Sequence, residues 1–147
     1  MKAARLVVFL GALCLLAGCG VASSDPPAPE AHEIAIDRAG AGAVRLTAEE
    51  YRFGLSKVTV RAGPVDFVLT NQGKWTHEAV VVPVEGTRYG QPVAQVGSVP
   101  SGESGAARVT LAPGRYIIVC LLAASRDSDV VSHWSQGMEA ELEVTPS

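Results

Sequence analysis

Residues 111–120 read LAPGRYIIVC, a turn sequence followed by an apolar strand that ends in a cysteine. Residues 112–114 supply the restricted and positive φ angles that a tight reversal requires. In the strand, Tyr116, Ile118 and Cys120 share one face, and apolar residues also fill the other face, as in strands that are covered on both sides. We therefore expect Cys120 to end a central strand in a buried position.

Similar short segments occur before and after this stretch. They are rich in valine, are separated by turn residues, and comprise Val44–Thr47, Lys57–Arg61, Val65–Thr70, His77–Val82, Ala107–Leu111 and Met138–Val144. This pattern predicts an all-β sandwich or barrel. Met138 shares the apolar face of the last segment, opposite its glutamates, and so points to the core. We expect a further edge strand at residues 33–37 and a long, glycine-rich connection at residues 86–105.

Composition indicates one globular domain, which we place at residues 33–147. The chain has 147 residues, of which 48% are hydrophobic and 18% charged, and this excludes a disordered or coiled-coil chain. The net charge is −3, without a block of lysine or arginine. Nucleic acid is therefore not an expected partner.

The first residues have the pattern of a bacterial lipoprotein signal. Two cationic side chains precede an apolar run at Leu6–Leu16, and small residues then lead to Cys19. The run is shorter than a bilayer-spanning helix, which needs about 20 residues. We expect residues 1–18 to be a signal peptide and Cys19 to be lipidated. An uncleaved anchor with an incidental cysteine is the alternative.

Lipidation of Cys19 predicts that the protein acts in the cell envelope, at the periplasmic or another extracytoplasmic face. The acyl chains would hold it to the membrane without a spanning helix. Residues 19–32 include the sequence SSDPPAPEA, whose prolines and small polar residues predict a flexible tether.

Few side chains of the mature protein can bind a soft metal ion. They are Cys120, Met138, His32, His77 and His133. We expect His32, at the end of the tether, to be solvated. Cys120 has no disulfide partner because lipid blocks Cys19.

Two histidines, a cysteine and a weak axial thioether make up the site of blue copper proteins. A structural zinc site is less favoured, because zinc seldom takes a thioether. A Cys-His nucleophile lacks an identifiable third residue, and a merely packed thiol stays open.

Residues 44–144 resemble the cupredoxins, the small type 1 copper proteins. The resemblance is carried by residues 71–73 ahead of Thr76-His77-Glu78, by residues 111–120, and by His133 with four residues before Met138. It implies a Greek-key β-sandwich that holds one copper ion. The implied ligands are three equatorial residues and one axial residue: His77, Cys120 and His133, with Met138 axial.

This chain departs from the family pattern in two places. Twelve residues separate Cys120 from His133, whereas small carriers have two to four there. Glu78 stands where many relatives carry an asparagine that ties the two ligand loops together. We expect that hydrogen bond to be absent or rerouted.

The resemblance implies an electron carrier that serves a redox partner protein, and the lipoprotein signal predicts that it does so tethered to the membrane in the envelope. His133 would be the ligand nearest the surface, and Leu121, Leu122 and Trp134 would form an apolar docking patch or fill the end of the core. Delivery of copper to an acceptor protein is an alternative, as is a metal-free interaction module. We do not expect an enzyme, since only His32 remains for a catalytic metal.

Overall fold

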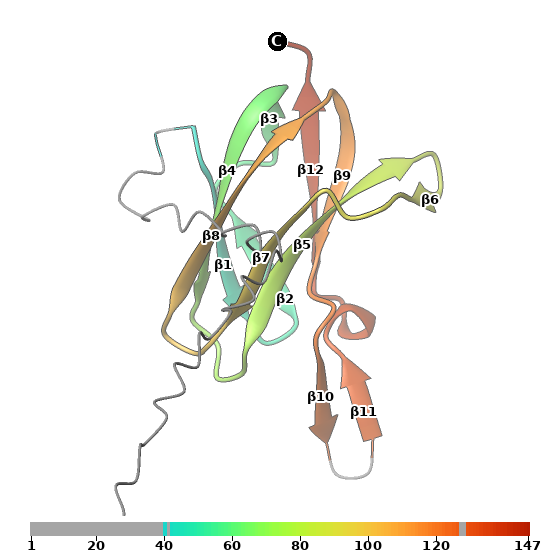
Figure 1. Ribbon diagram of the computed structural model, residues 1–147. Coiled ribbons are helices and arrows are strands. Elements are labelled where there is room, and N and C mark those ends of the chain that lie inside the picture. Colours follow the sequence, from blue (N-terminus) through green and yellow to red (C-terminus); the bar gives the residue numbers. More distant parts are fainter. Residues whose placement is uncertain (1–39, 41, 127–128) are drawn as a thin grey trace, which may run out of the picture. The chain divides into compact units, whose positions relative to one another are not determined.

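A computed structural model of the chain describes residues 40, 42–126 and 129–147 (Figure 1). The predicted signal, Cys19, the tether, His32 and the expected strand at 33–37 lie outside these residues. Within the described ranges, no helix is long and apolar enough to cross a membrane.

Short strands and one 3-10 helix make up the described regular structure. They are β1 (Val44–Glu49), β2 (Arg52–Leu55), β3 (Thr59–Arg61), β4 (Gly63–Asn71), β5 (His77–Glu85), β6 (Arg88–Tyr89), β7 (Ala94–Val99), β8 (Ser104–Leu111), β9 (Gly114–Val119), β10 (Ala123–Arg126), β11 (Asp129–Ser132), η2 (Trp134–Gln136) and β12 (Glu139–Thr145). Each of the seven segments that we predicted as strands, the one within 111–120 included, overlaps an observed strand.

The expectation of a long connection at residues 86–105 is wrong. This region contains β6, β7 and the start of β8, and β7 pairs with β5. Val96 and Val99 on β7 are buried in the core. Their spacing, interrupted by Gly97 and Ser98, gives no alternation, so the strand depends on its partner rather than on its own pattern.

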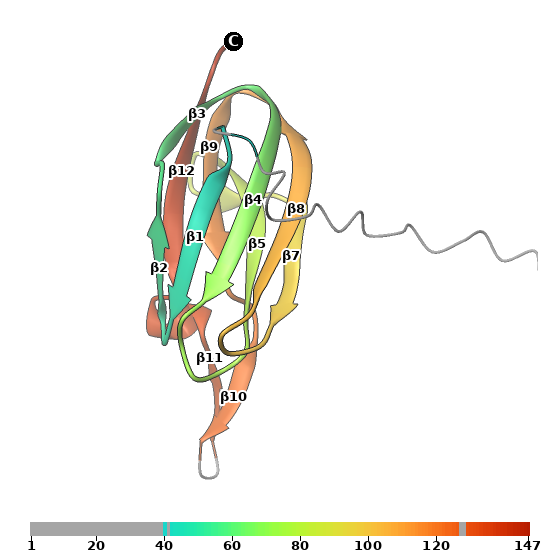
Figure 2. The same cartoon turned by 90° about the vertical axis from the view of Figure 1, so that its left-hand side faces the viewer.

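Two sheets face each other, as the strand pattern predicts (Figures 1 and 2). One has the order β2-β1-β4-β8, and the other β3-β12-β9-β5-β6 with β7 also on β5. The pairs β1–β4 and β3–β12 are parallel, and the remaining pairs are antiparallel. The core between the sheets includes Val44, Leu46, Phe67, Leu69, Ile118 and Leu142.

Strand β9 is apolar on both faces, as predicted. Tyr116, Ile118 and Cys120 belong to the main core. Ile117 and Val119 form a second buried cluster with β5 residues on the other face, where Trp134 packs against them. Because β9 has neighbours on both edges and cover on both faces, its end is a well-held place for a functional side chain.

Asp66 on β4 and Arg108 on β8 are directly opposed across the sheet. The guanidinium Nε and Nη2 donate to Oδ1 and Oδ2 at 2.5 and 2.7 Å. These hydrogen bonds hold the pKa of Asp66 below its ordinary value of 3.8. The pair therefore stabilises the fold only while the carboxylate is ionised.

We predict that Asp66→Asn lowers the free energy of unfolding by about 1 kcal/mol at pH 7, since Arg108 is largely exposed. Because the folded-state pKa is depressed, this contribution is complete above the unfolded pKa and is lost as pH falls through the folded one. Urea titrations of both proteins should show the difference disappearing in acid. An equal difference in unfolding free energy at pH 7 and in acid would contradict the prediction.

Candidate metal centre

Three of the four predicted donors converge at one end of the sandwich. His77 begins β5, Cys120 directly follows β9, and His133 precedes η2. Cys120 Sγ lies 3.3 Å from His133 Nδ1 and 4.0 Å from His77 Nδ1. One donor atom from each residue lies within 4.8 Å of the others. In the described part of the chain, no other group of three or more His, Cys, Asp or Glu side chains has this geometry.

Met138 lies at the same end of the sheet, directly before β12. Its backbone N–H donates to His133 O at 3.1 Å, and its carbonyl accepts from Cys120 N at 3.2 Å. The side chain is fully buried in the core cluster that contains Cys120. The backbone thus ties the predicted axial residue to two predicted equatorial ones.

The long segment between Cys120 and His133 is a β-hairpin. Strands β10 and β11 pair with each other, with Ala123 opposite Ser132, and project from one end of the sandwich (Figures 1 and 2). At the base, His133 N donates to Leu122 O at 2.9 Å. The two ends of the hairpin therefore meet at its base. The twelve residues between Cys120 and His133 are accommodated in this way, and His133 still lies beside Cys120.

Asn71 organises the turn that leads into His77. Its amide nitrogen donates to Trp75 O at 2.6 Å and to Val99 O at 2.8 Å, and its oxygen accepts from Gly73 N at 2.9 Å. The side chain is fully buried and uses both ends of its amide. We recognised residues 71–73 as a turn from the sequence, but its anchoring to β7 required the structure.

In many cupredoxins an asparagine after the first histidine links the two ligand loops, and we expected this hydrogen bond to be absent or rerouted. Glu78 makes the link here. Its Oε1 accepts from the backbone N–H of Leu121 at 3.2 Å, and its Oε2 accepts from Gln95 Nε2 at 2.7 Å. Glu78 directly follows His77, and Leu121 directly follows Cys120. A buried carboxylate, 5% exposed, therefore links the two ligand segments.

Three residues that we did not predict cover the centre: Glu50, Tyr51 and Trp75. Glu50 Oε1 accepts from the backbone N–H groups of Lys74 and Trp75 and lies 3.9 Å from His77 Nε2. No motif in the sequence marks these residues. They come from the β1–β2 turn and the turn before His77, and only folding brings them together.

The Tyr51 and Trp75 rings lie over His133. Their centroids are 5.6 and 6.0 Å from that of the imidazole. Tyr51 has a φ of 63°, the one positive value among the described residues other than glycine. Such a backbone costs about 1 kcal/mol and often occurs at functional sites. His133 is the most exposed predicted ligand, as expected, but only 2% of its surface is accessible.

Burial controls the protonation of the donors. It lowers the pKa of His77 and His133 and raises the pKa of the Cys120 thiol. At pH 7 both imidazoles and the thiol are therefore neutral in the metal-free protein. The two buried Nε2 atoms have no hydrogen-bond partner. Neutral imidazoles with Nδ1 beside a thiol fit a soft or borderline metal ion, because such an ion displaces the thiol proton.

Of the three residues that we expected to form an apolar docking patch or to fill the end of the core, only Leu121 is largely exposed. Leu121 is 46% exposed, whereas Leu122 packs against the main core and Trp134 against the second cluster. Trp134 also donates to Glu139 and contacts the Tyr89 ring. Of the two alternatives, core filling therefore holds for Leu122 and Trp134.

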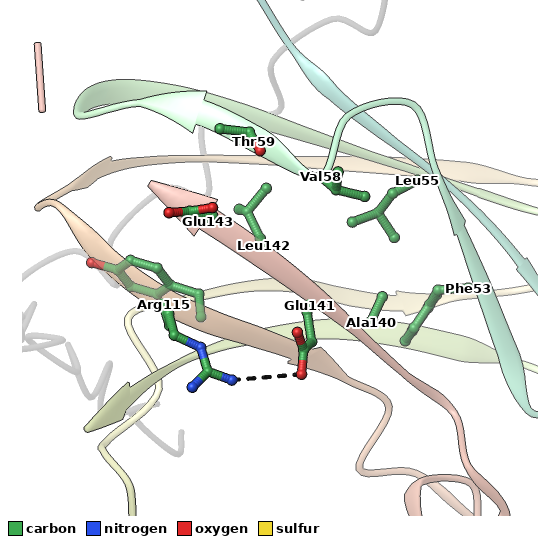
Figure 3. Close-up of a pocket in the computed structure, with 10 residues that line it drawn as sticks. Phe53, Leu55, Val58, Thr59, Arg115, Ala140, Glu141, Leu142 and Glu143 are labelled. Atoms are coloured by element: carbon green, nitrogen blue, oxygen red, sulfur yellow. Dashed lines mark ion pairs between the residues drawn. The ribbon is translucent and has the colours of Figure 1, made fainter. Parts of the chain in front are cut away.

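A cavity of about 550 Å³ lies elsewhere, between β2 and β12. Phe53, Leu55 and Leu142 line it, and Arg115 and Glu141 form an ion pair at its rim (Figure 3). None of the predicted donors lines this cavity. It therefore adds no group to the metal centre.

Comparison with known proteins links this chain to a fold. No protein-family model and no curated protein sequence matches it. Among solved structures it is similar to auracyanin B, with 22% identity over 72% of this chain and 90% of the other and a TM-score of 0.59. It is also similar to reduced auracyanin from the photosynthetic bacterium Roseiflexus castenholzii, with 17% identity over 73% and 99% and a TM-score of 0.55.

A third similar structure is auracyanin A, a blue copper protein from the green thermophilic photosynthetic bacterium Chloroflexus aurantiacus. It is 17% identical over 70% of this chain and 98% of the other, with a TM-score of 0.56. Each likeness covers most of both chains at low identity and therefore concerns the fold. Together with the two sheets and the His-Cys-His group at their end, these likenesses establish that the chain adopts the cupredoxin fold.

Proposed function

We propose that the protein is a mononuclear type 1 copper protein that carries electrons in the cell envelope. The observation that carries this proposal is the buried group of His77, Cys120 and His133, with donor atoms within 4.8 Å of one another. Met138 is proposed as the axial ligand, because it is buried beside Cys120 and bonded through its backbone to both loops. Copper bound there would accept one electron and pass it on.

The residues of this chain would serve such transfer by changing little between the two oxidation states. His77, Cys120 and Met138 are held by the adjacent strands β5, β9 and β12. Asn71, Glu78 and the base of the hairpin hold the connecting loops. A site supported in this way moves little when its charge changes, so little reorganisation opposes electron transfer.

We further propose that lipidated Cys19 tethers the protein to the membrane outside the cytoplasm, where it meets a redox partner protein. The sequence at residues 1–19 supports this part of the proposal. We also infer that the protein turns over no substrate. In the described residues, the cavity between β2 and β12 is separate from the donors, and the donors themselves are covered.

Cys120→Ser should abolish the proposed copper centre. A hydroxyl cannot replace a thiolate as a soft ligand, so the intense visible charge-transfer band of the copper-loaded protein should disappear. Visible absorption measures the band, and circular dichroism checks the fold. As a control, His32→Ala should keep the band, because His32 precedes the domain core. A band that persists in Cys120→Ser would remove Cys120 from the site.

The burial of all four proposed ligands favours an electron carrier over a copper-delivery protein. An acceptor protein would find no exposed ligand with which to begin a transfer. We predict that the loaded protein keeps its copper for hours in excess chelator, in both oxidation states. The visible band follows Cu(II), and the coloured chelator complex follows Cu(I). Complete transfer within seconds would favour delivery.

The hairpin at residues 123–132 should be dispensable for copper binding. Its base is already closed by the contact of His133 N with Leu122 O, so a short Asn-Gly turn could connect these positions. We predict that this replacement keeps the visible band of the loaded protein. Loss of the band, with the circular dichroism of the sandwich unchanged, would show that the hairpin holds His133 in place.

A further inference from the structure

Two glutamates approach the candidate centre from different parts of the chain. Glu50 comes from the turn between β1 and β2, and Glu78 is the second residue of β5. Neither carboxylate belongs to the predicted donor set. Each makes hydrogen bonds to the backbone of a segment that carries a proposed ligand.

Glu50 faces the outer side of the His77 ring. Its Oε1 accepts from the N–H groups of Lys74 and Trp75 and lies 3.9 Å from His77 Nε2, a nitrogen without a hydrogen-bond partner. Gly73 makes this approach possible. A Cβ there would lie 2.6 Å from Glu50 Oε1 and 3.0 Å from His77 Nε2. The chain thus leaves space for a carboxylate beside this imidazole.

A carboxylate in this position selects one tautomer of the ring. In a neutral imidazole one ring nitrogen carries a proton and the other has a lone pair. An acceptor beside Nε2 favours a proton on Nε2 and leaves the lone pair of Nδ1 toward Cys120, 4.0 Å away. At 3.9 Å this contact is electrostatic rather than a hydrogen bond, so the carboxylate acts on the ring through its charge.

Glu78 acts on the cysteine side. Both of its oxygens accept hydrogen bonds, from Leu121 N and from Gln95 Nε2. Glu78 directly follows His77 and bonds the N–H of the residue that follows Cys120, so its charge lies beside two of the proposed ligands.

Building on the proposed function, we propose that Glu50 and Glu78 are positioning residues of the copper site and that their charges favour Cu(II) over Cu(I). The charge of Glu50 favours the His77 tautomer whose Nδ1 lone pair is toward Cys120, and Glu78 holds the backbone that follows Cys120. Cu(II) carries one more positive charge than Cu(I), so nearby negative charge stabilises it more. The two glutamates therefore lower the reduction potential.

Removing either charge should raise the reduction potential of the copper-loaded protein. We expect Glu50→Gln and Glu78→Gln each to change the ratio of Cu(I) to Cu(II) affinity by about tenfold, a rise of about 59 mV for a one-electron couple. The matched control is Glu49→Gln, because Glu49 is adjacent to Glu50 but pairs with Arg52. Spectroelectrochemistry measures the potentials of the three variants and of the wild-type protein, and Glu49→Gln should match the wild type. Unchanged potentials in both test variants would overturn the proposed charge effect.

A second measurement needs no metal. In the metal-free protein, long-range ¹H–¹⁵N spectra of the imidazoles should show His77 with its proton on Nε2. Glu50→Ala should shift His77 to a mixture of tautomers, whereas Glu49→Ala should leave it unchanged. An unchanged His77 tautomer in Glu50→Ala would overturn the role of Glu50 in holding the ring.

The two measurements separate the inference from the proposed function. If the wild-type protein binds no copper, the proposed function fails and the charge effect fails with it, while the tautomer spectra still decide what Glu50 does. If copper binds with an intense visible band but neither potential nor tautomer responds, the proposed function stands and this inference fails.

Discussion

The close approach of one thiol and two imidazoles inside an apolar core is the constraint on which this structure depends. Cys120 Sγ lies 3.3 Å from His133 Nδ1, and the three residues are at most 2% exposed. Burial keeps them neutral without metal, yet two imidazole nitrogens remain without partners. Groups of this kind are costly in a core unless they serve a purpose. The partnerless atoms are the two Nε2 atoms, and a bound metal ion would use the other donors, Sγ and the two Nδ1 atoms that face it.

The sheet explains why most of the donors meet. Strand β9 lies between β5 and β12 and is antiparallel to both, so its end is next to the beginning of each neighbour. Cys120 follows β9, His77 begins β5, and Met138 precedes β12. Strand pairing alone therefore brings three of the four predicted residues to the same end of the sheet. His133 is different, because it depends on the closed base of a hairpin.

The surroundings of the donors show how the fold controls access to them. The Tyr51 and Trp75 rings lie against the His133 ring, Glu50 holds the turn before His77, and Glu78 holds the segment after Cys120. The Tyr51 ring reaches this position from a backbone with a φ of 63°, a conformation that is strained for a residue with a side chain. Two aromatic rings therefore lie against the imidazole, which is only 2% exposed.

The sequence alone determined the all-β class, seven of the strands and the two covered faces of β9, because these depend on side-chain alternation, and residue chemistry indicated four candidate donors. It did not predict β7, whose glycine-interrupted pattern forms a strand only against β5. It also did not reveal Glu50, Tyr51 and Trp75, or the link from Glu78 to Leu121. Only the tertiary structure decided these contacts, because they join residues far apart in the chain, and the distance between such residues is determined by packing rather than by local pattern.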